Sequence, residues 1–323
     1  MLTKENPHWH FSLLIFRKGA ELNITRVFIG DPKEKIIWSP DGRFITLGVG
    51  HPGTDNYSYP IEFWDPGNGH LSKKLSVTSV DTGGFSPDGA LFLSADRKGR
   101  FNVYDTQTWN GVGGKADEFP IDTGLVITNG QGWLDKQHFV VLGAWVGKRG
   151  ERPLIQTSEG HVLDHSVVMQ KIDVSGKASR ATAVLFPLPT ATSPPGEAPY
   201  QCEDILVVPG GKLIAALCGR GSQFIIKFFD GETLKGISTY IASPDSHTRA
   251  GEFGASFSSD GQFLFLLAHN KNDETVQSEI VSTLTGRLVG SFPSAESWGL
   301  AVSPDGHILA VGHKGNIELF NIN

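Results

Sequence analysis

A short unit of strands and turns near the end of the chain constrains the fold more than any other feature. It is the stretch Gly299–Asn321, GLAVSPDGHILAVGHKGNIELFN, which reads as three short apolar strands separated by two turns. In its first turn Pro304 fixes φ, Asp305 can hydrogen-bond its own backbone and Gly306 accepts a positive φ. Because such a unit cannot bury both faces of its sheet alone, one copy predicts further copies.

The same turn recurs along the chain after similar apolar strands. Three clear copies and two degenerate ones are present: Ser39-Pro40-Asp41-Gly42, Ser86-Pro87-Asp88-Gly89, Ser259-Asp260-Gly261, Leu134-Asp135-Lys136 and Val208-Pro209-Gly210-Gly211. Successive turns are separated by 47, 47, 75, 50 and 45 residues. A period of about 40 to 50 residues with several strands in each repeat predicts an all-β fold, a single β-propeller.

The ends of the third strands add a family resemblance. They read Phe63-Trp64-Asp65, Val103-Tyr104-Asp105, Phe228-Phe229-Asp230 and Leu319-Phe320-Asn321. Together with the turns, these motifs resemble the WD40 and PD40-type (TolB-like) propeller repeats over most of the chain. Only Trp64-Asp65 is a true Trp-Asp pair, and the Gly-His pairs stand at other places in their repeats. The resemblance therefore implies the fold, but not the hydrogen-bond network of WD40 repeats.

The repeat spacing predicts one domain over residues 1–323 with six four-stranded blades. Seven blades are the alternative, with the extra one inside Glu151–Phe186. The last repeat has only three strands, so we expect an N-terminal outer strand from residues 1–30 to close the ring, with Glu21–Gly30 pairing with Asn316–Asn321. Residues 147–165 and 187–199 are interpreted as loop insertions. They explain why the third spacing between turns is 75 residues long.

Composition limits the classes of partner and the compartment. Lysine and arginine total 28 against 34 acidic residues, a net charge of −6, which argues against a nucleic-acid partner. No apolar run is long enough to span a membrane, and the first residues lack the apolar core of a signal peptide, so we expect a cytoplasmic protein with no membrane partner. Cys218 is interpreted as a small buried residue, with a disulfide to Cys202 as the less favoured alternative.

Superimposing the repeats on their turns brings six side chains to the end of the second strand. They are His51, Lys98, Trp145, Arg220, His269 and His313, and we expect them on one face of the disc near the central channel. His51, His269 and His313 come from repeats that become neighbours when the ring closes. Three imidazoles are a recognised set of ligands for a divalent metal, although scattered surface histidines are the simpler interpretation.

Acidic side chains precede the inner strands and should lie around the same channel mouth. They are Glu34, Asp81, Glu203, Glu252 and Glu296. Carboxylates at such positions often only stabilise turns, but acids beside imidazoles could form a ligand pocket or an acid–base pair. The sequence contains no nucleophile elbow, P-loop or dinucleotide fingerprint.

Two functions of different classes remain open on the sequence alone. The first is a scaffold that binds a protein or peptide partner, favoured by the absence of a catalytic motif and by the repeat resemblance. The alternative is an enzyme or small-ligand binder with the predicted site, metal-dependent or not, at the mouth of the channel. Fold alone does not choose between them, and no cofactor is assigned.

Overall fold

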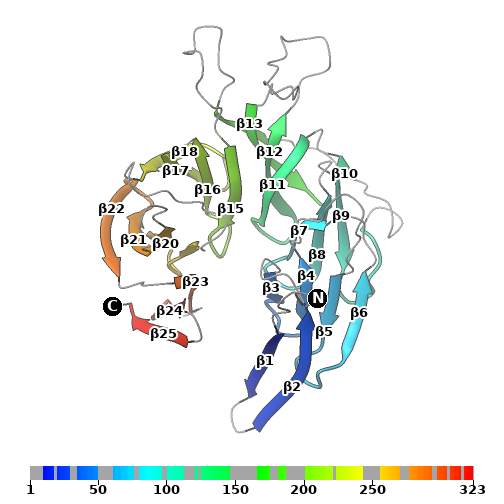
Figure 1. Cartoon of the computed structure of the whole chain (residues 1–323). Helices are drawn as coiled ribbons and strands as arrows, with labels where there is room; N and C mark the ends of the chain where they lie inside the picture. The colour runs from blue at the N-terminus through cyan, green and yellow to red at the C-terminus, as the bar shows by residue number, and fades with distance from the viewer. Residues whose placement is uncertain are drawn as a thin grey trace, which may run out of the picture.

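The regular structure of the chain consists of short antiparallel strands (Figure 1). This computed structural model describes residues 10–17, 20–29, 35–49, 61–75, 80–96, 100–112, 121–122, 125–145, 166–174, 181–186, 201–220, 223–242, 255–269, 276–292, 297–303, 306–313 and 316–322. Within these ranges the strands form six small sheets and one separate hairpin. No helix with the length and apolar character needed to cross a bilayer is found among these residues.

We number the sheets as blades 1 to 6 in chain order. Blades 1 to 3 consist of β3 (Lys35–Trp38), β4 (Ile45–Val49), β5 (Ile61–Trp64) and β6 (Leu71–Leu75); β7 (Val80–Phe85), β8 (Leu91–Asp96), β9 (Arg100–Asp105) and β10 (Ile121–Asp122); and β11 (Leu125–Trp133), β12 (His138–Trp145), β13 (Ser166–Asp173) and β14 (Ala181–Phe186).

Blades 4 to 6 follow the same plan. They consist of β15 (Gln201–Val207), β16 (Leu213–Arg220), β17 (Gln223–Asp230) and β18 (Gly236–Ile241); β19 (Ala255–Phe257), β20 (Phe263–His269), β21 (Val276–Ser282) and β22 (Arg287–Phe292); and β23 (Ser297–Val302), β24 (Ile308–His313) and β25 (Asn316–Asn321). The hairpin consists of β1 (His10–Arg17) and β2 (Ala20–Ile29).

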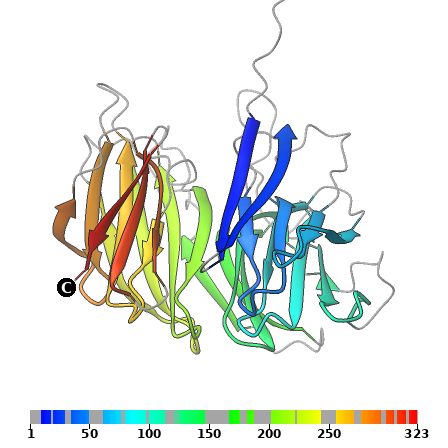
Figure 2. The same ribbon diagram turned by 90° about the horizontal axis from the view of Figure 1, so that it is seen from below.

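Each blade is an antiparallel meander in which every strand pairs with the next one along the chain. The first strands of neighbouring blades contact one another, for example β7 with β11 and β11 with β15, so the first strands are the innermost ones. Figure 2 shows the sheets standing side by side, with the axes of their strands roughly aligned. This is the arrangement that the repeat predicts, and the six small antiparallel sheets of the described residues are consistent with propeller blades.

Apolar side chains between consecutive blades form the core. One cluster joins blades 1 and 2 through Phe63 and Phe92, and another joins blades 4 and 5 through Phe228 and Leu264. Similar clusters join blades 2 and 3, 3 and 4, and 5 and 6. Among the described residues no such cluster joins blade 6 to blade 1. Closure of the ring is therefore not shown.

The predicted closure is not shown at the described ends of the chain. In the structure β2 pairs with β1, and blade 6 has three described strands while the other blades have four. The pairing of Glu21–Gly30 with Asn316–Asn321 therefore stays a prediction. β13 and β14 complete blade 3, so the described part of Glu151–Phe186 holds no separate seventh blade. The predicted insertions at residues 147–165 and 187–199 lie outside the described residues.

The two cysteines correct a prediction made from the sequence. Cys218 is buried as expected, but it is not free, because it forms a disulfide with Cys202 across β15 and β16. The two residues are direct partners in the strand register, and a bulge between Cys202 and Asp204 sets that register. Disulfides are rare in the cytoplasm. The expected cytoplasmic location is not tested by the structure and stays a prediction.

Replacing both cysteines with alanine should lower the stability of the protein by about 3 kcal/mol, because a bond between residues 16 apart removes closure entropy from the unfolded chain. Urea unfolding of the oxidised protein and of the Cys202→Ala, Cys218→Ala variant measures this loss. A reducing agent should destabilise the unaltered protein by a similar amount and leave the double variant unchanged. Equal stability of the two proteins under oxidising conditions would contradict the bond.

Candidate functional site

The second strands of four consecutive blades end at residues predicted for the channel site. Trp145 is the last residue of β12, Arg220 of β16, His269 of β20 and His313 of β24. These four backbone positions are therefore equivalent in their blades, as the repeat register requires. Their side chains, together with all of His51 and Lys98, lie outside what the structure describes. The pocket itself stays a prediction.

The predicted acids fall on the inner strands or just before them. Asp81 lies at a bulge of β7 and Glu203 at a bulge of β15, whereas Glu34, Glu252 and Glu296 lie outside the described residues. Bulges redirect a side chain and are frequent beside functional sites. Among the residues that the structure describes, no three metal-binding side chains are grouped to hold an ion. The described part of the chain thus provides no test of the three-histidine metal site.

The carboxylates of the recurring turns have a structural task that the geometry makes explicit. The Ser86 hydroxyl donates to Asp88 Oδ1 at 2.7 Å and accepts from the backbone N–H of Leu91 at 2.9 Å. The same pair of hydrogen bonds recurs in blade 5, where Ser258 and Asp260 stand at the positions of Ser86 and Asp88. The serine hydroxyl is the largest cause that lowers the pKa of Asp88 and of Asp260. These acids stay ionised to hold their turns.

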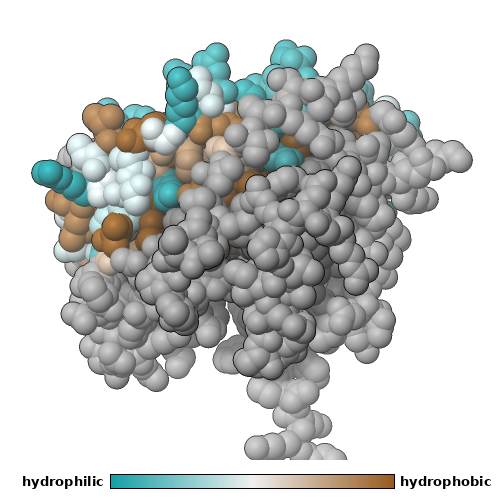
Figure 3. Space-filling model, turned by 90° about the horizontal axis from the view of Figure 1, so that it is seen from above, coloured by the Kyte–Doolittle hydropathy of each residue, from teal (hydrophilic) through white to brown (hydrophobic). Residues whose placement is uncertain are grey.

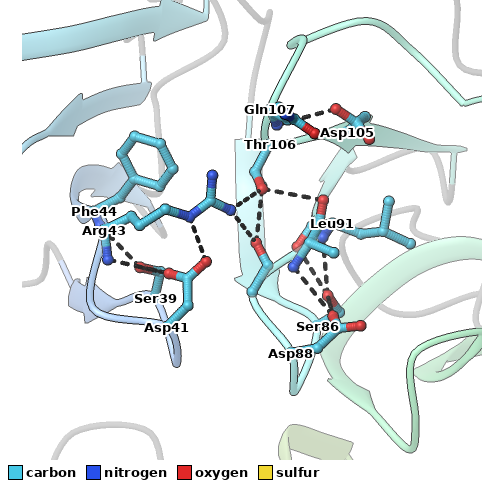
Figure 4. Close-up of polar contacts among 12 residues, drawn as sticks. Ser39, Asp41, Arg43, Phe44, Ser86, Asp88, Leu91, Asp105, Thr106 and Gln107 are labelled. Carbon is cyan, nitrogen blue, oxygen red and sulfur yellow. Dashed lines mark hydrogen bonds and ion pairs between the residues drawn. The ribbon is translucent and has the colours of Figure 1, made fainter.

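An arginine connects the turns of the first two blades (Figure 4). Arg43 follows the blade 1 turn, donates from Nε to Asp41, and donates from Nη2 to the Thr106 hydroxyl at 2.8 Å and to the Gly89 carbonyl at 3.3 Å. Thr106 in turn donates to the Gly89 carbonyl at 2.7 Å. One guanidinium therefore joins the turn of one blade to the turn of the next, which fixes their spacing.

The aspartates that end the third strands also cap turns. Asp105 accepts from the backbone N–H of Thr108 at 2.7 Å, and Asp230 accepts from the hydroxyl of Thr233 at 2.6 Å. These bonds are the largest causes that lower the pKa of Asp105 and of Asp230. The aspartate that recurs at the end of the third strand is thus explained by turn chemistry, without the hydrogen-bond network of WD40 repeats.

A row of polar residues that sequence reasoning missed lies three positions before the last residue of each third strand, or, in blade 1, before Asp65 directly after that strand. Its six members are Glu62, Asn102, Gln170, Lys227, Glu279 and Glu318. Two of them contact the preceding blade: Lys227 Nζ donates to the Leu185 carbonyl at 2.6 Å, and Tyr240 donates to Glu279 Oε2 at 2.7 Å. Period alone could have found the row, but the partners of Lys227 and Glu279 lie in another blade and cannot be recognised from the sequence.

We expect Glu279 to make the stability of the protein depend on pH. Burial raises its pKa above the ordinary 4.5, although the hydrogen bond from Tyr240 acts the other way. A raised folded-state pKa means that its stabilising contribution is complete below pH 4.5 and is lost as the pH rises through the folded value. We expect the free energy of unfolding, relative to that of a Glu279→Gln variant, to fall as the pH rises above about 4.5.

Urea unfolding of both proteins between about pH 4.5 and pH 7.5 measures this difference. Glu232→Gln, at an exposed carboxylate in the turn after β17, is the matched control and should track the unaltered protein at every pH. Parallel pH profiles for the unaltered protein and for Glu279→Gln would contradict the assignment.

Comparison with known proteins agrees with this geometry. The family described as WD domain, G-beta repeat matches residues 66–105, which run from the turn before β6 to the end of β9. That segment is one repeat: the outer strand of blade 1 and the three inner strands of blade 2. The predicted resemblance to WD40-type repeats is therefore confirmed. No curated protein matches the chain.

Two solved structures share the fold at low sequence identity. Hydrazine synthase of Kuenenia stuttgartiensis is similar over 88% of this chain and 75% of its own, with 14% identity and a TM-score of 0.57. The computationally designed Ika8 protein is similar over 88% of this chain and 70% of its own, with 12% identity and a TM-score of 0.51. The chain therefore has a WD40-like β-propeller fold. Identities this low carry the fold alone.

Proposed function

We propose that this protein is a scaffold that binds a protein or peptide on the outer rim of blades 4 and 5. The observation that carries the proposal is a group of exposed apolar residues there: Ile237, Leu284, Leu288 and Val289, with the Leu284 side chain 75% exposed. Figure 3 shows brown apolar groups at the surface of the described part. Apolar groups that gather on a surface often mark binding sites.

The rim is continuous across the two blades. The Ser238 hydroxyl of β18 donates to the Thr283 carbonyl, and a Cβ at Gly286 would lie 2.3 Å from the Thr239 carbonyl oxygen. The turn after β21 therefore rests directly on the outer strand of blade 4, which brings Leu284 beside the strand that carries Ile237. Both outer strands bulge at their exposed apolar residue, Ile237 in β18 and Val289 in β22. A bulged edge disfavours pairing with another sheet, so side-chain contacts suit this surface.

A phage-displayed peptide library tests the scaffold function. Selection on the folded protein should enrich peptides with apolar anchors, and the Leu284→Asp, Val289→Asp variant should lose their binding while its melting temperature is unchanged. The matched control is Glu232→Gln in the exposed turn of blade 4, which should keep the binding. Failure to enrich any peptide, or equal binding by the aspartate variant, would refute this rim as the binding surface.

The alternative function is a small-ligand or metal site at the mouth of the channel. It is supported by the equivalent positions of Trp145, Arg220, His269 and His313 at four second-strand ends. Elemental analysis of the purified protein tests it: a metal held by the histidines should be present near one equivalent and be lost in His269→Ala and His313→Ala. Protein free of metal before and after incubation with Zn²⁺ would remove the metal hypothesis.

We also propose that Glu21–Gly30 completes blade 6 as its outer strand, against β25. The support is that blade 6 has three described strands where blades 1 to 5 have four. Deleting residues 1–30 would then expose a sheet edge and lower the melting temperature. A truncated protein that melts like the full chain would exclude this pairing.

A further inference from the structure

The row of polar residues on the third strands supplies hydrogen bonds at the buried junctions between blades. At the junction of blades 3 and 4, Lys227 Nζ donates to the Leu185 carbonyl at 2.6 Å. At the junction of blades 4 and 5, the Tyr240 hydroxyl donates to Glu279 at 2.7 Å. In both cases the partner belongs to the outer strand of the preceding blade. A polar group at such a junction is thus paired, as burial requires.

Gln170 holds the same position in blade 3, but its oxygen has no partner in the described part of the chain. The residue is only 8% exposed, and its Oε1 is buried without a hydrogen bond. Its register partner Val141 belongs to the apolar cluster between blades 2 and 3, so Gln170 faces blade 2 as well. A buried amide oxygen without a donor is costly, so this junction needs a donor from elsewhere.

A second amide lies at the same level of this junction. Gln131 of β11 is the register partner of Val141 on the other side from Gln170. The next residue, Gly132, faces blade 4, because a Cβ there would lie 2.3 Å from Val207 Cγ2, and Gln131 therefore faces blade 2. Both Nε2 and Oε1 of Gln131 are buried without a hydrogen-bond partner in the described part of the chain. Two incompletely bonded amides thus flank one valine.

The junction has room for a small molecule and apolar walls. Gly84 lies on β7, which contacts β11, and a Cβ built on Gly84 would meet no atom within 4 Å. Trp133 of β11 donates from Nε1 to the Gly84 carbonyl at 3.0 Å, which places this room beside β11. Phe101 and Phe139 of the same junction are fully buried. Such walls disfavour a charged ligand, which would lose its hydration without a counter-charge.

We infer that the junction of blades 2 and 3 is a binding site for an ordered water molecule held between Gln131 and Gln170. Buried waters make about three hydrogen bonds, and the two amides offer two acceptor oxygens and one donor nitrogen. A water both donates and accepts, so it satisfies both kinds of group. It takes the place of the direct bonds that Lys227 and Glu279 make at the next two junctions. The site goes beyond the scaffold function and does not depend on it.

A high-resolution crystal structure of the whole chain tests the site directly. We expect an ordered water within hydrogen-bonding distance of Gln170 Oε1 and of the Gln131 amide. A direct hydrogen bond between the two amides, or no density between them, would overturn the inference. Peptide binding at the rim of blades 4 and 5 is unaffected by this result, so the two proposals can fail separately.

Thermal unfolding of methionine variants gives a second measurement. Gln131→Met and Gln170→Met should each lower the melting temperature, because the water and the remaining amide lose a partner. The double variant should lose less than the sum of the two shifts, since no polar group is then left unpaired. Gln107→Met, at an exposed amide in the turn of blade 2, is the matched control and should melt like the unaltered protein.

A dry junction predicts the opposite sign. Each methionine would then remove a buried, unpaired polar group, and the melting temperature of both single variants should rise. A rise in the single variants, or shifts that add exactly in the double variant, would overturn the shared water.

Discussion

Replacing Phe63 with alanine should destabilise the protein by about 3–5 kcal/mol, the range found for large aromatic residues removed from a packed core. Phe63 is fully buried between blades 1 and 2. Its ring lies 4.9 Å from that of Phe92 and 4.3 Å from that of Trp109, measured between centroids, with Phe44 and Phe85 also in contact. Alanine would leave a cavity that aromatic rings on several sides cannot fill.

Urea unfolding measures the loss, and Leu284→Ala is its control. Leu284 is also apolar, but its side chain is 75% exposed in a turn, so its removal should change the free energy of unfolding by less than about 0.5 kcal/mol. Phe63→Leu should fall between the two, because it keeps part of the volume. If Phe63→Ala unfolds at the same urea concentration as Leu284→Ala, blades 1 and 2 are not joined by this cluster.

The repeat predicts most of the fold because its turns are local. Proline, aspartate and glycine within four residues specify the turn, and Gly89 and Gly261 have the positive φ that the motif requires. Even the degenerate turn at Val208-Pro209-Gly210-Gly211 was assigned correctly, since Gly211 has a φ of +72°. Third-strand ends such as Asp105 and Asp230 follow the same logic. What depends on a few consecutive residues could be predicted from the sequence.

The disulfide could not be predicted, because it depends on a bulge. The alternation of side chains along β15 and β16 does not show which residues of the two strands pair. One extra residue after Cys202 places that cysteine opposite Cys218. The Tyr240–Glu279 hydrogen bond joins residues 39 apart in neighbouring blades, beyond any local pattern. The channel site combines both difficulties. Its strand ends follow the register, but its assembly requires blades 1 and 6 to meet.

Replacing Gly211 with alanine should cost about 4 kcal/mol, for two separate reasons. Its φ of +72° is strained for any residue with a Cβ, which costs about 1–2 kcal/mol. In addition, the new Cβ would lie 1.9 Å from the carbonyl oxygen of Leu134 in the turn of blade 3. Because the obstacle is backbone rather than a flexible side chain, the two blades would have to move apart, at a further cost typical of overpacking, about 1–3 kcal/mol.

The neighbouring Gly210→Ala variant separates the cost of the positive φ from the cost of the contact with Leu134. Gly210 has a φ of +86°, but no atom lies within 4 Å of its Cβ position, so its substitution should cost only the conformational part, about 1–2 kcal/mol. Urea unfolding of the two variants side by side gives the cost of the contact between blades 3 and 4 as their difference. Equal losses for Gly210→Ala and Gly211→Ala would mean that the turn of blade 4 does not rest on Leu134. The packing of this turn on the turn of the preceding blade would then also be wrong.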